Sequence, residues 1–116
     1  MNNIEYKIYQ VKKEKCRQFG FVGIDELKKL QGTNEPQKEN YNLVYTGELK
    51  SSTIPLRTLG ELFQKFNIDR PKDFISRSMS VSDIVTLNKN GVITAWYCDS
   101  IGWKEVQFKG KKEFKC

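Results

Sequence analysis

The sequence contains no histidine among its 116 residues. Histidine is the commonest general base and the commonest transition-metal ligand in proteins, so its absence excludes Ser-His-Asp and Cys-His catalysis. Cysteine is also scarce: Cys16, Cys98 and Cys116 are odd in number, widely spaced and form no Cys-x-x-Cys pair. The sequence therefore predicts no metal site and no disulfide framework, and a reducing compartment such as the cytoplasm is the expected location.

Long apolar runs are missing as well. The first residues, MNNIEYKIYQ, lack the apolar core of a secretion signal, and no later run is long enough to span a membrane. The length and a hydrophobic content of 38% fit one globular domain over residues 1–116. Nothing in the composition or motifs calls for a cofactor.

Basic residues are in excess, with 20 Lys and Arg against 14 Asp and Glu and a net charge of +6. Such a balance favours an acidic partner, either nucleic acid or an acidic protein surface. The basic residues form two clusters, each at the end of a predicted strand: Lys12, Lys13, Lys15 and Arg17, and Lys109, Lys111, Lys112 and Lys115. If the first and last strands lie near each other, the clusters form one phosphate-binding patch; otherwise they are a solvated surface and a frayed end.

Alternating apolar residues predict strands over residues 4–11 and 41–49. Residues 83–99 predict a β-hairpin turned at Asn90-Gly91, because this pair tolerates positive φ. A turn over residues 99–102 and a strand over 101–108 complete a C-terminal β-meander.

Helices are predicted over residues 23–32 and 57–68. Gly32 ends the first, and Thr58 and Glu61 match a capping box at the start of the second, while Pro55 falls in the loop before it. These elements predict an α+β fold, with an antiparallel sheet of four to five strands and two helices on one face.

The polar stretch between the second helix and the hairpin is predicted to be a structural joint. Asn67 and Asp69 suit local turns, and Pro71 forbids continuation of the helix and starts a short turn that buries Phe74. Ser80, Ser82 and Asp83 precede the hairpin, where they either cap a turn or bind loop amides.

A metal-dependent nuclease would need carboxylates that converge on one point. With a two-residue turn at Asn90-Gly91, Asp83 faces Cys98 across the hairpin. Because side chains alternate between faces, Asp83 and Asp99 then point to opposite sides of the sheet and cannot share a metal.

Several segments resemble the YodL-like family of Gram-positive mobile elements. The resemblance covers nearly the whole chain and is most specific in FNIDRP (66–71), SVSD (80–83) and the run from Tyr97 to Trp103, which includes Asp99 and Gly102. The family usually carries a histidine just before the serines, where this chain has Ser76 and Arg77. Any chemistry that needs this histidine is therefore absent here.

The resemblance implies an accessory protein of a mobile element, of the kind that includes inhibitors of type II CRISPR effectors. The expected action is binding to the effector, its guide RNA or their complex, and interference with guide assembly. Trp103 and Tyr97 either stack on bases or pack within the sheet. Two alternatives stay open: a ribonuclease that trims guide RNA, with Glu61 as its candidate residue, and an interaction module with another partner.

Overall fold

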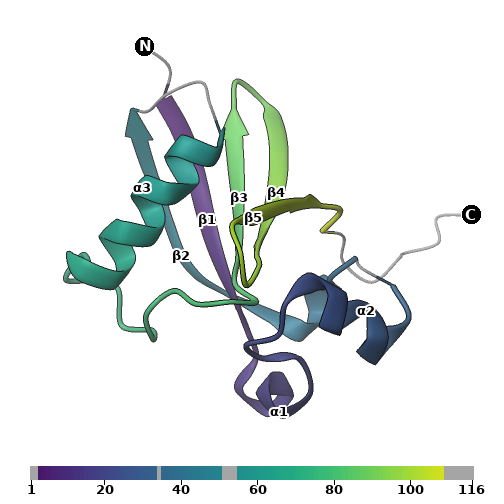
Figure 1. The fold of residues 1–116 in the computed structure, drawn as a ribbon. Coiled ribbons are helices and arrows are strands. Elements are labelled where there is room, and N and C mark those ends of the chain that lie inside the picture. The colour runs from purple at the N-terminus through teal and green to yellow at the C-terminus, as the bar shows by residue number, and fades with distance from the viewer. Residues whose placement is uncertain (1–2, 34, 51–54, 109–116) are drawn as a thin grey trace, which may run out of the picture.

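The computed structural model describes residues 3–33, 35–50 and 55–108 (Figure 1). The described elements are β1 (Asn3–Val11), the 3-10 turn η1 (Lys13–Lys15), α1 (Cys16–Phe19), α2 (Ile24–Gln31), the 3-10 turn η2 (Lys38–Asn40), β2 (Tyr41–Lys50), α3 (Pro55–Ile68), β3 (Ile84–Lys89), β4 (Val92–Cys98) and β5 (Trp103–Val106). The strands form one five-stranded antiparallel sheet in the order β2-β1-β3-β4-β5. The predicted α+β class and the C-terminal meander are confirmed.

The hairpin of β3 and β4 has the predicted turn and register. Asn90 and Gly91 have φ values of 55° and 86°, which are the left-handed conformations that a two-residue hairpin turn requires. Lys89 pairs with Val92. At the other end, the Cys98 N–H donates to the Asp83 carbonyl and the Cys98 carbonyl accepts from the Ser82 N–H. The alternation of side chains along both strands is therefore fixed by the turn.

The helix α3 packs on one face of the sheet (Figure 1). Leu59, Leu62 and Phe66 are buried against Tyr6 and Val85, and the Phe66 ring lies in the centre of this cluster. Its centroid is 5.1 Å from that of Tyr45 and 4.8 Å from that of Phe74, both edge-on. This aromatic cluster is the larger of two cores, and the predicted turn that buries Phe74 contributes to it.

The helix α2 packs with side chains that alternate to the other face. Its buried Leu27 packs against Tyr9, Ile84 and Tyr97. Each of these three residues is adjacent in its strand to a residue that packs on the α3 side, and side chains alternate between the two faces of a sheet. The prediction of two helices on one face is therefore wrong. The sequence shows which stripe of a helix is apolar, but the side of the sheet it covers depends on the path of the connecting loops.

The predicted start of α3 is also wrong. Thr58 is fully buried inside the helix, so it is not the N-cap, and Pro55 is already helical. Proline suits the first turn of a helix because its missing N–H would have no intrahelical acceptor there. By contrast, α2 ends as predicted, with Gly32 in the left-handed conformation. None of the helices in the described ranges is both long and apolar enough to cross a membrane.

Candidate functional site

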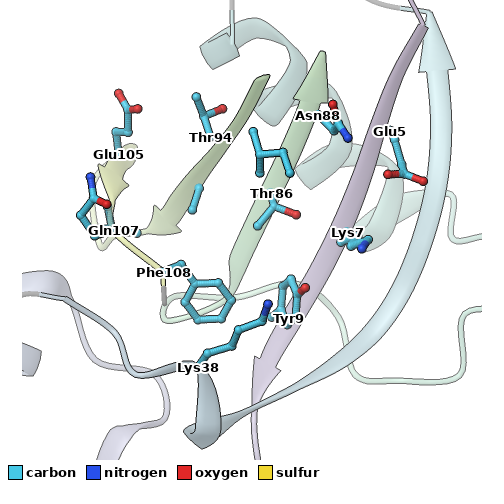
Figure 2. A pocket seen from close by; sticks show the side chains of 13 residues that line it. Glu5, Lys7, Tyr9, Lys38, Thr86, Asn88, Thr94, Glu105, Gln107 and Phe108 are labelled. Atoms are coloured by element: carbon cyan, nitrogen blue, oxygen red, sulfur yellow. The ribbon is translucent and has the colours of Figure 1, made fainter. Parts of the chain in front are cut away.

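The sheet face opposite α3 is only partly covered, and its open part is hollowed (Figure 2). One row of register partners crosses four strands here, from Lys7 through Thr86 and Ala95 to Val106. Thr86 and Ala95 have short side chains and form the floor, while the larger side chains of Lys38 and Phe108 rise at one end. The hollow has a volume of about 380 Å³.

Two lysines line this hollow. The Lys38 ammonium group lies 5.5 Å from the ring centre of Tyr9 and 5.8 Å from that of Phe108, so cation–π attraction holds it at the hollow's edge. Lys7 lies on β1 directly across from Thr86. Within residues 3–33, 35–50 and 55–108, neither ammonium group forms a hydrogen bond or an ion pair. Both charges are therefore available to an anion.

Glu5 and Asn88 occupy the next row, followed by Ile93, which is 65% exposed. The Glu105 side chain points away from the floor of the hollow in Figure 2. The end of the hollow near Tyr9 is therefore cationic, and the end near Glu5 is mixed in character.

The first basic cluster continues directly from the strand that lines the hollow. Lys12 follows β1 directly, Lys13 and Lys15 lie in η1, and Arg17 lies in α1. We call residues 12–17 the basic segment. Lys13 and Arg17 are exposed. No ion pair neutralises any of these four side chains in the part of the chain that the structure describes.

The second predicted cluster, Lys109, Lys111, Lys112 and Lys115, lies outside the described residues. The two clusters were predicted to form a single patch if the first and last strands lie near each other. In the sheet, β3 and β4 separate β1 from β5, so these strands are not neighbours. However, Phe108, the last residue described, packs edge-on against Tyr9 and Tyr41 at centroid distances of 4.9 and 5.4 Å. The chain after β5 thus returns to the end of β1.

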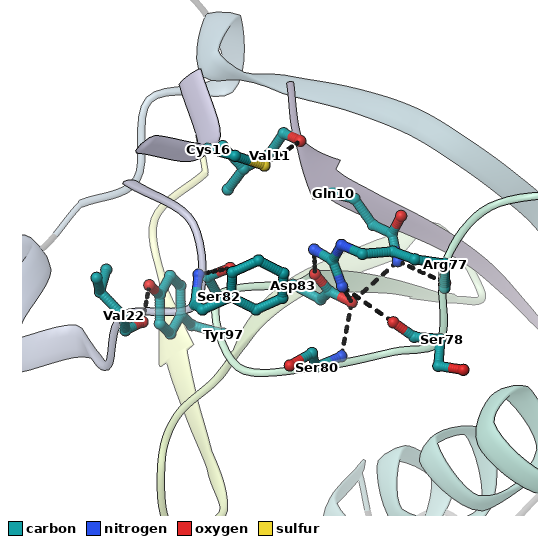
Figure 3. A network of polar contacts seen from close by, with 11 residues as sticks. Gln10, Val11, Cys16, Val22, Arg77, Ser78, Ser80, Ser82, Asp83 and Tyr97 are labelled. Atoms are coloured by element: carbon teal, nitrogen blue, oxygen red, sulfur yellow. Dashed lines mark hydrogen bonds and ion pairs between the residues drawn. The ribbon is translucent and has the colours of Figure 1, made fainter. Parts of the chain in front are cut away.

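A polar network organises the stretch before β3 (Figure 3). The Asp83 carboxylate is fully buried and accepts hydrogen bonds from Arg77 Nη2 at 2.6 Å, Arg77 Nη1 at 3.3 Å, the Ser80 N–H at 2.9 Å and Gln10 Nε2 at 3.1 Å. Gln10 also donates to the Arg77 carbonyl. The loop is thereby fastened to β1, an interior strand of the sheet.

Burial dominates the ionisation of this carboxyl group. It raises the pKa of Asp83 to about 6, although the charge and hydrogen bonds of Arg77, together with those from Ser80 and Gln10, act in the opposite direction. Burial likewise raises the pKa of the Cys98 thiol to about 12. Cys98 therefore stays protonated near neutral pH and is a poor nucleophile.

The same loop holds the segment between α1 and α2. Ser82, with a φ of 86°, accepts a hydrogen bond from the Phe21 N–H through its hydroxyl oxygen, and the Arg77 guanidinium lies 4.7 Å from the Phe21 ring centre. The Tyr97 hydroxyl donates to the Val22 carbonyl at 2.6 Å. The loop therefore fixes both β1 and the entry to α2.

Asp99 serves α2 from the other side. Its Oδ1 accepts from the Ile24 N–H at 3.0 Å and from the Ser100 N–H at 2.8 Å. A carboxylate at this place satisfies an unpaired amide and complements the positive end of the helix dipole. Gly102, with a φ of 71°, closes the turn by accepting from the Asp99 N–H.

The remaining motif residues lie at the end of α3. Asn67 lies in the last turn of α3, where its Oδ1 is buried and has no hydrogen-bond partner among the described residues. The Asp69 N–H donates to the Lys65 carbonyl and ends the helix. Pro71 accepts from the Phe74 N–H in a tight turn. The contacts of these residues lie in loops and helix ends, away from the hollow.

The carboxylates weighed for catalysis do not gather at one point. Asp83 and Asp99 bind different amides on opposite faces, as predicted from the hairpin register. Glu61 lies on the exposed side of α3, across the sheet from the hollow. In the described parts of the chain, no three Cys, Asp or Glu side chains could hold one metal ion.

Tyr97 and Trp103, which were predicted either to stack on bases or to pack within the sheet, are both packed in the structure. Tyr97 is fully buried, and Trp103 packs edge-on against Phe63 beneath α3. The rings at the hollow are instead Tyr9 and Phe108, which sequence reasoning missed. Sequence reasoning also missed the role of Arg77. An arginine three residues before the Ser80–Asp83 segment, SVSD, could have indicated an ion pair with Asp83.

The profile of the YodL-like domain matches residues 5–108, which span all five strands and the three α-helices. No curated protein and no solved structure shows significant similarity to the chain. The FNIDRP, SVSD and Asp-Ser-x-Gly segments lie inside the matched range, where they join α3, the Asp83 network and α2 to the sheet. The chain therefore belongs to the YodL-like domain family.

Proposed function

We propose that this protein is an inhibitor from a mobile genetic element that binds the guide RNA of a type II CRISPR effector and blocks its assembly with the effector. The observation that carries the proposal is the open polar face of the sheet. Lys7 and Lys38 line its hollow without an ion pair among the described residues, and the basic segment follows β1. The hollow and the basic segment thus supply cationic side chains at two places on or next to β1.

The sign of the charge decides between two ways of blocking an effector. An acidic protein can occupy the basic channel that holds guide and heteroduplex by imitating nucleic acid. A protein with a net charge of +6 is repelled by that channel and attracted to the RNA that fills it. We therefore favour capture of the guide over occupation of the effector's channel.

The test is an order-of-addition experiment with purified protein, a type II effector and guide RNA. We expect DNA cleavage to be inhibited when the protein meets the guide first and to be unaffected when the effector is already loaded. The guide should run at full length on a denaturing gel. Shortened guide would indicate the trimming ribonuclease instead, and Glu61→Gln would then be the first variant to assay.

A matched pair of variants tests the surface. Lys13→Glu with Arg17→Glu reverses two exposed charges of the basic segment, and Lys28→Glu with Lys29→Glu makes the same change on exposed positions of α2. We expect the first pair to raise the half-inhibitory concentration about tenfold or more, with a weaker salt dependence, and the second to change it little. Equal effects, or inhibition through the loaded effector, would contradict guide capture.

A further inference from the structure

The hollow in Figure 2 is a concave site lined by charged, polar and apolar side chains, whereas nonspecific attraction of RNA requires only exposed positive charge. Lys38 and Tyr9 lie at one end, and Lys7 and Thr86 form the next row along the strands. A short-side-chain floor and the exposed Ile93 extend from them to Asn88 at the other end. A ligand that fills this space must carry an anionic group at one end and a flat, weakly polar body at the other.

Building on the proposed function, we propose that the hollow binds one unpaired nucleotide of single-stranded RNA. Its phosphate would lie between Lys7 and Lys38, and its base would lie on the floor of Thr86 and Ala95. Base edges present hydrogen-bond donors and acceptors, which the Asn88 amide and the Glu5 carboxylate can meet.

The size of the hollow supports a ligand of this kind. Its volume of about 380 Å³ falls at the lower end of the range of about 300–1,000 Å³ typical of small-ligand sites. The floor is low because Thr86 and Ala95, which are register partners on adjacent strands, both have short side chains. A low floor leaves space above the sheet for a planar base.

The position of Lys38 supports an anion. Its ammonium group is already held over two rings, so little side-chain freedom remains to be lost when a phosphate binds. Lys38 also forms no ion pair or hydrogen bond with any residue that the structure describes. A base within a duplex is stacked on both sides and cannot reach the floor, so the site selects unpaired nucleotides.

The test uses the full chain, labelled with ¹⁵N, and a five-nucleotide single-stranded RNA, with adenosine 5′-monophosphate as the minimal probe. We expect both probes to shift the amide signals of Thr86, Ala95 and Phe108. Lys7→Gln and Lys38→Gln should each weaken binding of the RNA about tenfold and lower the salt slope by about 0.7. Thr86→Phe fills the hollow and should abolish binding of the mononucleotide.

Lys65→Gln is the control, since Lys65 is an exposed lysine of α3 on the other side of the sheet. Circular dichroism melts confirm that each variant is folded, and the two Gln variants keep the proposal testable if Thr86→Phe is not. The proposal is overturned if the shifts fall only in the basic segment, or if Lys65→Gln weakens binding as much as Lys7→Gln. It is also overturned if duplex RNA or a pentaglutamate peptide binds equally well at the hollow.

The two proposals fail separately. Inhibition in the order-of-addition experiment without any shift at the hollow would retain guide capture and overturn the nucleotide site. Nucleotide shifts at the hollow without inhibition of the effector would retain the site and overturn guide capture.

Discussion

Removing the Arg77 guanidinium should destabilise the fold in a strongly pH-dependent way. In Arg77→Met the fully buried Asp83 carboxylate loses two charged hydrogen bonds, at 2.6 and 3.3 Å. Breaking a buried pair in this way costs about 3–5 kcal/mol. Because the Arg77 side chain is 30% exposed, we take the lower end, about 3 kcal/mol, at pH 7.5. Loss of the contact with the Phe21 ring adds about 0.5–1 kcal/mol.

The pH dependence follows from the carboxyl group. The pKa of Asp83 in the folded protein, about 6, is above its ordinary value of 3.8, so the folded state holds the proton more tightly than the unfolded state. This contribution to stability is complete below about pH 4 and is lost as pH rises through 6. Arg77 lowers the pKa of Asp83, so this pKa is higher in the variant that lacks Arg77. The variant therefore continues to lose stability at higher pH than the parent, by up to about 1.4 kcal/mol per pH unit. The stability difference between the variant and the parent should therefore widen from about pH 5 to pH 7.5.

The assay is urea unfolding at pH 5.0 and 7.5, followed by the fluorescence of Trp96 and Trp103. Arg70→Met is the control, because Arg70 makes one long contact of 3.4 Å with a carbonyl in the same loop. Asp83→Asn introduced into both the parent and Arg77→Met should remove the widening. A destabilisation by Arg77→Met that is below 1 kcal/mol, or equal at both pH values, would refute the reasoning.

Three further substitutions have opposite or smaller effects on the free energy of unfolding. Gly47→Ala should destabilise the protein by more than about 1 kcal/mol, because a Cβ there would lie 2.5 Å from the Tyr6 hydroxyl, and urea unfolding measures it. Gly60→Ala in α3 meets nothing within 4 Å and should stabilise by up to about 1 kcal/mol, so a loss of stability would contradict the packing described. Tyr97→Phe should cost about 1 kcal/mol and leave the Val22 carbonyl unpaired, and faster hydrogen exchange at the entry to α2 should accompany it.

The elements with strong local signals are those that the sequence predicts well. Asn90-Gly91 determines the hairpin turn, and the turn determines that Asp83 faces Cys98. Gly32 ends α2 because the left-handed conformation costs glycine little. The start of α3 was predicted wrongly because Thr58 and Glu61 matched a capping pattern inside a helix that was already under way.

The hollow and the faces of the helices depend on contacts between distant segments. The alternation of side chains shows which residues share a face with Lys7 or with Thr86 within each strand. It does not show that β1 and β3, which carry these two residues, are neighbours in the sheet. Lys38 and Phe108 come from a 3-10 turn and from the chain after β5, which have no periodicity. Neither their proximity nor the cation–π contact could be inferred until the strand order was known.

The place of β1 between β2 and β3 in the sheet has a consequence for how the chain folds. The strand β1 pairs on one side with β2 and on the other with β3, where Ile4 lies opposite Lys89. The pairing of β3 with β4 is local, whereas β1 has a vacant edge until β3, far along the chain, pairs with it. Because closing such a long loop precedes the contacts that stabilise it, we expect folding to be slow for a domain of this size.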